Sequence, residues 1–294
     1  SIPKKIIIIG SGAIGCEFSY YFNEFGSEVH LIEAKTDILP VEDIEVSKEL
    51  ERGFKESGTF IYKSTNVIKA ESLKNKVKVH VSEKDEVRIL EADYALLAIG
   101  VTGNIENSGI EDVGIITENG SIKVNKYNQT NIPNIYAIGD VSGPPWLAHV
   151  ASVQGALSIE HAFEGSAQTI DYNNIPGCTY TQPQVGSIGL TEKAALNEGI
   201  NIKVGKYSFK SNGKAMAVGH NDGFVKLIFD EQYGELIGAH IIGSEATELI
   251  GQLSVAKALE STWEDLAFGV FAHPTLSEAI MEAALDAYGI GIHQ

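Results

Sequence analysis

Residues 5–33 open the chain with a pattern of hydrophobic and polar positions that predicts a strand, a turn, a helix and a second strand. Residues 6–9 are four isoleucines. A run this apolar and β-branched is typical of a central parallel strand covered on both faces. The glycine-rich residues 10–15 follow it. A helix is predicted over 13–25 and the second strand over 28–32.

The same alternation of strands and helices continues to about residue 102. Apolar residues at helical spacing among charges predict an amphipathic helix over 42–57. Short alternating stretches over 67–91, separated by charged turns, predict an antiparallel meander where a simple α/β fold would place another helix. The other predicted elements are strands over 59–62, 92–99 (buried and parallel) and 130–138, and a helix over 147–164.

From residue 175 onward the pattern is one of strands that meet in hairpins. Such strands predict an antiparallel sheet with helices on one side, which leaves the other face to be covered. The strands are predicted over 185–190, 203–209, 223–229 and 236–242, and the helices over 191–198, 245–260 and 277–287. The sequence therefore predicts an α/β protein in three parts: a Rossmann-type parallel-sheet domain with an antiparallel meander (1–102), a central segment (103–173) and an α+β domain (174–294).

The glycine turn, Gly10-Ser11-Gly12-Ala13-Ile14-Gly15, predicts a dinucleotide site. Gly10 would make the tight turn, Gly12 would let backbone N–H groups approach a pyrophosphate, and Gly15 would let the helix pack closely on the strand. Glu33 ends the next strand, 18 positions after Gly15, where it can accept hydrogen bonds from ribose hydroxyls. The glycine spacing alone also occurs by chance, so the prediction depends on the strand, the helix and the acid around it.

A second acidic residue, Asp140, follows the predicted strand 130–138 and precedes the predicted helix 147–164. Beside a helix N-terminus it can bind a sugar-like hydroxyl chain, while the first amides of the helix bind phosphate. The alternative interpretation is an aspartate that only caps a helix or a turn.

His273 is a candidate acid–base residue. Pro274 follows it and confines its backbone to extended conformations, which helps to fix where the imidazole points. Histidine exchanges protons near neutral pH, and a carboxylate such as Glu278 can orient it. The alternative is a capping box, in which Glu278 accepts from a backbone N–H at Thr275. The residues alone leave both interpretations open.

Composition restricts the class of partner. The net charge of −17 disfavours nucleic acid and anionic membranes, because no Lys/Arg block offsets it. No apolar run approaches the ~20 residues that cross a bilayer. Cys16 and Cys178 follow no metal-binding or redox spacing, so we expect no metal site and a reducing, cytoplasmic location. Cys16 is interpreted as a packing residue, with a reactive thiol as the alternative.

Four blocks in this order resemble the pyridine nucleotide-disulfide oxidoreductases, and within them the enzymes that oxidise dihydrolipoamide. They are residues 10–15, 98–100, 135–140 with 147–149, and 273–278. The resemblance implies a homodimer with NAD and FAD as cofactors, dihydrolipoamide as substrate and a 2-oxoacid dehydrogenase complex as partner. It also implies that the central segment completes the FAD site and that the last domain forms the dimer interface.

The same resemblance implies the roles of individual residues in the NAD site. Residues 10–15 would hold the pyrophosphate, Glu17 would lie near the nicotinamide, and Glu33 would bind the adenosine ribose. Val67 and Gly100 would line the same site. The chain carries Glu33-Ala34-Lys35-Thr36-Asp37 after the second strand, where NADP enzymes usually place more basic residues, and this favours NAD.

For the remaining sites, the resemblance implies that Asp140 binds the FAD ribityl chain, with Ala148 at a neighbouring amide contact. His273 would serve the redox disulfide of the other subunit, and Glu278 would orient it. The residues after Gly100 lack an arginine that many relatives have.

The first FAD fingerprint and a CxxxxC pair are also absent from these 294 residues. We therefore expect an N-terminal half to precede Ser1, and the 294 residues to be inactive alone. The alternatives are another flavin disulfide reductase, of the glutathione or mercuric type, and a non-catalytic NAD-binding dimerisation module.

Overall fold

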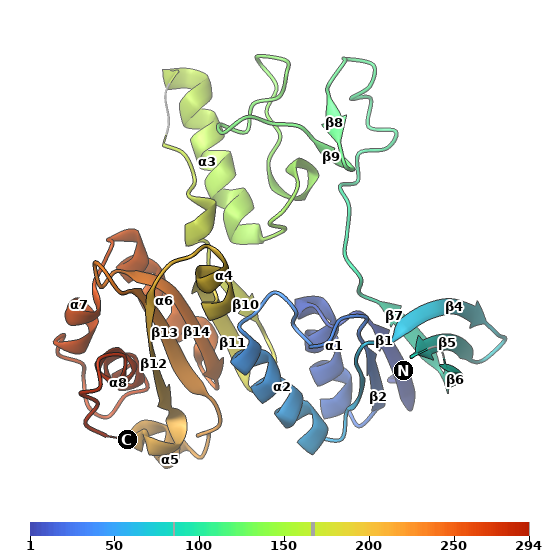
Figure 1. The fold of residues 1–294 in the computed structure, drawn as a ribbon. Helices are drawn as coiled ribbons and strands as arrows, with labels where there is room; N and C mark the ends of the chain where they lie inside the picture. The colour runs from blue at the N-terminus through green and yellow to red at the C-terminus, as the bar shows by residue number, and fades with distance from the viewer. Residues whose placement is uncertain (85, 166–167, 294) are drawn as a thin grey trace. The chain divides into compact units, whose positions relative to one another are not determined.

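The chain forms two compact units in a computed structural model that describes residues 1–84, 86–165 and 168–293 (Figure 1). The first unit combines residues 1–99 with 176–294, and the second holds residues 100–175. The mixed α/β fold class is confirmed, because the first unit contains a parallel sheet and antiparallel sheets. The division into three domains stays a prediction.

The first unit begins with a four-stranded parallel sheet in the order β3-β2-β1-β7. Its elements are β1 (Lys5–Ile9), α1 (Ala13–Glu24), β2 (Glu28–Ile32), α2 (Ile44–Glu56), β3 (Phe60–Tyr62) and β7 (Tyr94–Leu97). Ile6 and Ile8 share a core with α1 and α2, whereas Ile7 and Ile9 pack on the opposite face. Burial of each such side chain contributes roughly 1.5–3 kcal/mol. The prediction of a central strand covered on both faces is confirmed.

The predicted meander is also confirmed. It consists of β4 (Asn66–Ser72), β5 (Val77–Glu83) and β6 (Glu86–Ala92), which form an antiparallel sheet with β5 in the middle. Val79 and Val81 on β5 pack against Ile7 and Ile9. The meander therefore covers the face of the parallel sheet that the helices leave open.

The prediction of a buried strand over 92–99 is only partly right. β7 pairs with β1 in parallel, as expected. However, Tyr94 is 58% exposed and Leu97 is 68% exposed. The reason is that β7 is the edge strand of its sheet, with β1 on one side only.

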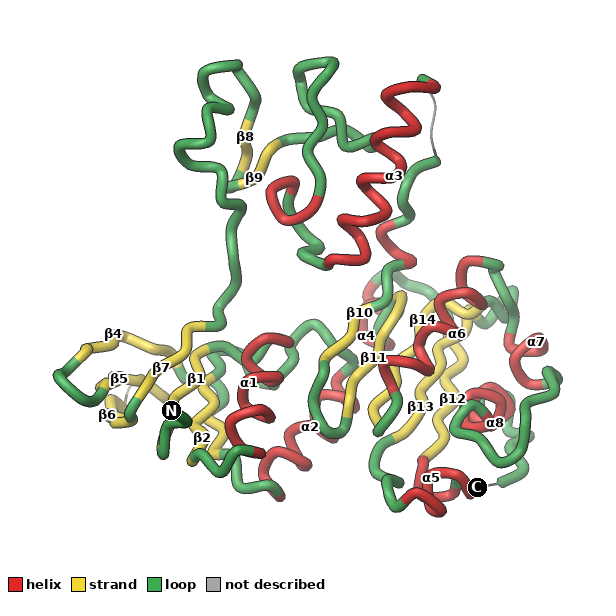
Figure 2. Tube along the Cα trace, turned by 180° about the vertical axis from the view of Figure 1, so that it is seen from behind, coloured by secondary structure: helices red, strands yellow, loops and turns green. Residues whose placement is uncertain are grey.

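Residues 177–243 form a five-stranded antiparallel sheet in the order β10-β11-β14-β13-β12 (Figure 2). Its strands are β10 (Gly177–Thr179), β11 (Gln184–Gly189), β12 (Ile202–Ser208), β13 (Phe224–Asp230) and β14 (Leu236–Gly243). The helices are α4 (Glu192–Asn197), α5 (Gly213–Val218), α6 (Ala246–Ala258), α7 (Trp263–Ala267) and α8 (Glu278–Asp286). One face of the sheet packs against α6 and α8, with Val225, Leu227 and Phe229 in the shared core.

The opposite face of this sheet is covered within the same chain, whereas the sequence pattern left it open. Val185, Phe224 and Ile242 share a core with Val46 and Leu50 of α2. The first part of the chain therefore covers this face, which the sequence pattern left open. A dimer contact through that face is not needed to bury it.

The second unit contains β8 (Thr117–Glu118), β9 (Ser121–Ile122), a 3-10 turn over Gly139–Ser142, α3 (Ala148–Glu164) and a second 3-10 turn over Tyr172–Asn174. The helix predicted over 147–164 is confirmed. The strand predicted over 130–138 is wrong: in the described part of this unit, only a single bridge joins Gln129 to Tyr136. An apolar segment becomes a regular strand only where a neighbouring strand pairs along it.

Candidate functional site

The glycine turn joins β1 to α1. Two of its glycines are required by close packing, and the third borders open space. An added Cβ at Gly10, whose φ is +97°, would lie 2.4 Å from Ala98 O. One at Gly15 would lie 1.9 Å from Gly10 O. The fold itself therefore requires both glycines. An added Cβ at Gly12 would meet nothing within 4 Å, so the space beside it is open to a ligand.

The N-terminus of α1 supplies donors at this open space. Gly12 caps the helix without a side-chain hydrogen bond, and Ala13 and Ile14 are exposed. The first N–H groups of a helix have no intrahelical acceptor, and they bind anions well. Backbone amides can therefore hold a phosphate here although the chain as a whole is strongly negative.

Glu33 locks the glycine turn in place. Its Oε2 accepts hydrogen bonds from Ser11 N at 3.0 Å and Ser11 Oγ at 2.6 Å, and its Oε1 accepts one from Lys35 N at 2.8 Å. Burial raises the pKa of Glu33, but these donors outweigh burial and lower the pKa overall. A carboxylate has about four acceptor positions, and these described donors use three of them, so Oε1 can accept one further hydrogen bond.

Three other predicted NAD residues lie in different surroundings. Glu17 on α1 accepts a hydrogen bond from Tyr180 N at 2.9 Å, so it ties α1 to the end of β10. Val67 lies at a bulge in β4, two residues after Thr65, whose N–H donates to Glu33 O at 2.9 Å. Gly100 is the first residue of the second unit and has a φ of +123°. The structure thus brings the glycine turn, Glu17, Glu33 and Val67 into one unit.

His273 and Glu278 meet at the start of α8. Glu278 Oε1 lies 2.9 Å from His273 Nδ1, and Glu278 Oε2 accepts from Thr275 N at 2.8 Å. Glu278 therefore makes both predicted contacts, one with each oxygen, but the full capping box does not form, because Ser277 precedes α8 without a side-chain cap and Thr275 Oγ1 donates to Ala272 O. The imidazole is 77% exposed. Burial raises the pKa of Glu278, but Thr275 N–H and His273 outweigh it and lower the pKa overall.

Asp140 and Ala148 lie at one end of α3 in the second unit. Asp140 is exposed and belongs to the turn over Gly139–Ser142. Gly139 N donates to Gln154 Oε1 at 2.7 Å, which ties this turn to α3. Ala148 begins α3, and Leu147 before it provides no side-chain cap. The exposed carboxylate of Asp140 and the first amides of α3 can both contact a polar ligand.

Three side chains with notable partners were not predicted from the sequence: Lys226, Glu282 and His293. Lys226 is 0% exposed on β13, and Glu282 on α8 is 2% exposed. Glu282 accepts from His293 Nδ1 at 2.6 Å and from His293 N at 3.2 Å, which repeats the Glu278 arrangement one helical turn later. The signal was present in the sequence: one lysine stands within the apolar run 224–229.

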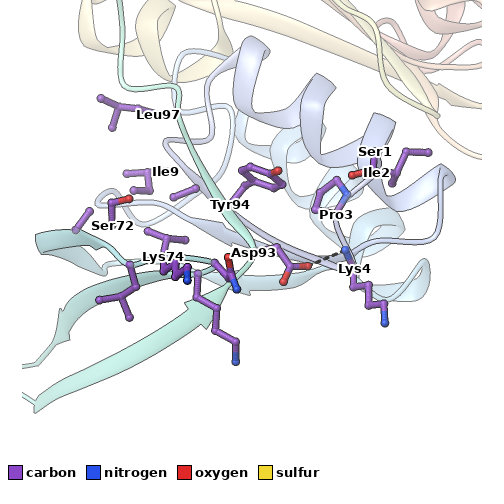
Figure 3. A pocket seen from close by; sticks show the side chains of 16 residues that line it. Ser1, Ile2, Pro3, Lys4, Ile9, Ser72, Lys74, Asp93, Tyr94 and Leu97 are labelled. Carbon is purple, nitrogen blue, oxygen red and sulfur yellow. Dashed lines mark hydrogen bonds between the residues drawn. The ribbon is translucent and has the colours of Figure 1, made fainter.

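One hollow in the described part of the structure is not lined by any predicted site residue. It measures about 990 Å³, and residues 1–4, 72–77 and 93–95 contribute to its wall (Figure 3). Asp93 in this wall accepts a hydrogen bond from Lys4 N at 2.8 Å. It is an open groove of mixed polarity, and we assign it no function.

Among the described residues, no three His, Cys, Asp or Glu side chains come together as metal ligands would. No helix in the same part of the chain is long and apolar enough to span a membrane. Cys16 is buried, its Sγ lies 3.3 Å from Ser11 O, and burial raises its pKa, which supports a packing role.

Comparisons with known proteins point to one family. A profile described as Pyridine nucleotide-disulphide oxidoreductase matches residues 1–155, and one described as the dimerisation domain of that family matches residues 175–284. The chain is 45% identical over 291 residues to a dihydrolipoyl dehydrogenase of Rhizobium etli, covering 98% of this chain and 60% of the relative. It is 43% identical over 296 residues to that of Zymomonas mobilis, covering 100% of this chain and 63% of the relative. The chain thus spans less than two thirds of these relatives.

Two solved structures share the fold. LpdA from Mycobacterium tuberculosis matches with a TM-score of 0.88 at 29% identity, over 97% of this chain and 61% of that one. The Cu(II) complex of the HOCl-induced flavoprotein disulfide reductase RclA from Escherichia coli matches with a TM-score of 0.90 at 26% identity, over 97% of this chain and 64% of that one.

Proposed function

Because this chain belongs to the pyridine nucleotide-disulphide oxidoreductase family, we propose that it contributes to an NAD-dependent dihydrolipoamide dehydrogenase. It would form the NAD site, one side of an FAD site and the acid–base pair. The observation that carries the proposal is the 2.9 Å contact between His273 and Glu278, because an NAD-binding module alone has no use for it. When bound, NAD and FAD supply the hydride chemistry.

The glycine turn fits a dinucleotide. The open space beside Gly12 admits a pyrophosphate, and the first amides of α1 can donate to it. Glu33 keeps one acceptor position for a ribose hydroxyl after it has bound Ser11 and Lys35. Its negative charge would oppose a 2′-phosphate, although the nearby Lys35 partly offsets that charge. These features support NAD rather than NADP.

Asp140 and Ala148 fit part of a flavin site. The exposed Asp140 can accept hydrogen bonds from hydroxyls of the ribityl chain, and the uncapped start of α3 at Ala148 can donate to a phosphate. Both residues would contact one side of the cofactor. The rest of its surroundings would come from outside these two residues and the first turn of α3.

His273 would perform the proton transfer of the dithiol step. An exposed imidazole oriented by Glu278 can take a proton from a thiol of dihydrolipoamide, because only the thiolate is nucleophilic. The imidazole would return the proton later in the cycle. Pairing of Nδ1 with Glu278 leaves Nε2 as the nitrogen that exchanges the proton.

The proposed assembly is a homodimer that works with a 2-oxoacid dehydrogenase complex in the cytoplasm. A match to a dimerisation domain over residues 175–284 supports the dimer. Cys16 and Cys178 are both free thiols, which suits a reducing compartment. The relatives named dihydrolipoyl dehydrogenase support the complex.

Another flavin disulfide reductase is the second candidate function. The fold matches RclA, described as a flavoprotein disulfide reductase, with a TM-score of 0.90. Turnover of dihydrolipoamide by the complete protein, compared with turnover of glutathione disulfide, separates the two candidates. Preference for glutathione disulfide would replace the first proposal with the second.

Gly12→Ala tests the dinucleotide site without disturbing the fold. The new methyl group meets nothing in the protein, so the unfolding midpoint should stay within about 1 °C. The methyl group would occupy the space proposed for pyrophosphate, so NADH affinity measured by calorimetry should fall about tenfold or more.

Gly213→Ala is the matched control, because an added Cβ there also meets nothing within 4 Å and the site lies at the start of α5. It should leave NADH affinity unchanged. Unchanged affinity in Gly12→Ala as well would remove the glycine turn from the proposed site.

A further inference from the structure

A row of polar side chains crosses the antiparallel sheet on the face that packs against α2. Ser187 pairs with His240, His240 with Lys226, and Lys226 with Lys206, on four neighbouring strands. Lys226 is 0% exposed and His240 is 1% exposed. Buried polar groups are costly unless they are paired, so the partners of this row should be specific.

Lys226 finds its main partners in the first part of the chain. Its Nζ lies 3.1 Å from both carboxylate oxygens of Asp43 and 2.8 Å from Glu45 Oε1, and a third carboxylate, Glu192 Oε2, lies 2.6 Å away. Asp43 is itself only 1% exposed. The same Asp43 carboxylate caps α2, because its Oδ1 accepts from Glu45 N at 3.0 Å. One buried carboxylate therefore begins α2 and binds a lysine from the antiparallel sheet.

The contact at Asp43 continues to the glycine turn through a series of hydrogen bonds. Ser47 N donates to Asp43 O at 3.0 Å, and Ser47 Oγ donates to Leu39 O at 3.2 Å. Leu39 N donates to Ser11 O at 2.9 Å. Leu39 has a φ of +42°, which is uncommon for a side chain of its size and needs support from its surroundings. Ser11 in turn binds Glu33.

We propose that Lys226 is a positioning residue for the glycine turn: it holds Asp43, and through Asp43 and Leu39 it holds Ser11 in the geometry that binds the dinucleotide. A Rossmann-type unit does not itself require a lysine from another sheet. The link makes the NAD site depend on the docking of the antiparallel sheet. The ligand in this inference depends on the proposed function, whereas the positioning of the turn does not.

The test uses the complete protein with Lys226→Met and the double variant Lys226→Met/Asp43→Asn. The single variant leaves Asp43 buried without its cation, which can prevent folding. The double variant removes both charges and keeps an Asn cap on α2, so it decides the question if the single variant does not fold. Glu192→Gln is the control, because it also removes a carboxylate from Lys226 but lies on α4.

Two quantities are measured on each folded variant: NADH affinity by calorimetry, and hydrogen exchange at the amides of Leu39 and residues 10–15 without nucleotide. The double variant should bind NADH about fivefold or more weakly and exchange faster at these amides, whereas Glu192→Gln should match the wild type in both. Wild-type affinity and exchange in the double variant would overturn the proposal, as would equal losses in Glu192→Gln. If the wild type fails to bind NADH, the proposed function fails, and exchange alone still decides the positioning role.

Discussion

Glu33 and Glu278 both bind a backbone N–H, yet they serve different kinds of site. Glu33 is buried; one of its oxygens accepts hydrogen bonds from Ser11, and the other accepts one from Lys35 N. Glu278 gives one oxygen to Thr275 N and the other to the exposed imidazole of His273. The first carboxylate fixes the loop that we propose binds NAD, whereas the second also orients the imidazole that we propose exchanges protons. The two sites differ because the second oxygen contacts a backbone N–H at Glu33 and an imidazole at Glu278.

Glu42 shows what happens when a carboxylate in a buried position lacks such donors. Ser187 Oγ donates to its Oε1 at 3.1 Å, but Oε2 is shut off from solvent and has no partner among the described residues. Burial raises the pKa of Glu42 to about 6, opposed by Ser187 and aided by Asp43. The number of donors therefore accounts for the opposite directions of the pKa shifts at Glu33 and Glu42.

The largest effect is expected when the imidazole of the second site is removed. In the complete protein, His273→Gln should slow dihydrolipoamide oxidation by about 100-fold or more, the usual contribution of a positioned acid–base group. Flavin reduction by NADH, followed by absorbance in a stopped-flow instrument, should change far less. His220→Gln, at another exposed histidine, is the control. Equal loss in both half-reactions would make His273 a structural residue.

Glu42→Gln tests whether the pKa of Glu42 is raised in the folded protein. The folded-state pKa of about 6 exceeds the ordinary 4.5, so the stabilising contribution of Glu42 is present below about pH 4.5 and is lost as pH rises through 6. At pH 8 the variant should therefore be more stable than the wild type by about 2 kcal/mol, and near pH 4.5 the two should be similar.

Chemical unfolding at the two pH values measures this difference. Glu24→Gln, at an exposed glutamate, should show little difference at either pH. A Glu42→Gln variant whose advantage does not grow between pH 4.5 and pH 8 would contradict the raised pKa.

Glu278→Gln should have a smaller effect than His273→Gln, because the imidazole remains. We expect dihydrolipoamide oxidation to fall roughly tenfold as His273 loses its anionic partner. The unfolding midpoint should fall only slightly, since the Gln carbonyl can still accept from Thr275 N. Unchanged turnover with a lower midpoint would mean that Glu278 acts only as a helix cap.

The local sequence pattern predicted an element correctly where segments close in sequence pair with it and cover it. The isoleucine run, the glycine turn and the meander were all predictable, because β1 is paired on both sides and covered on both faces by nearby sequence. Residues 130–138 were also predicted as a strand, but they include Pro133 and two asparagines, and the described structure has only one bridge there, between Gln129 and Tyr136. Periodicity indicates which side chains avoid water, but strand pairing depends on distant residues.

The site residues were likewise predictable only where their partners could be inferred from local sequence. Glu33 and Glu278 were predictable because their partners lie near in sequence or follow a known spacing. The ion pair between Lys226 and Asp43 spans 183 positions, and no local spacing predicts it. The packing of α2 on the antiparallel sheet was likewise missed, because complementary apolar faces of two separate segments cannot be matched by periodicity alone.

The central claim is that the glycine turn and Glu33 form an NAD site. Calorimetric titration of the protein with NADH and with NADPH tests it most directly. We predict that NADH binds about tenfold or more tightly, because the charge of Glu33 opposes a 2′-phosphate and its open acceptor position suits a hydroxyl. Equal or tighter binding of NADPH would contradict the account.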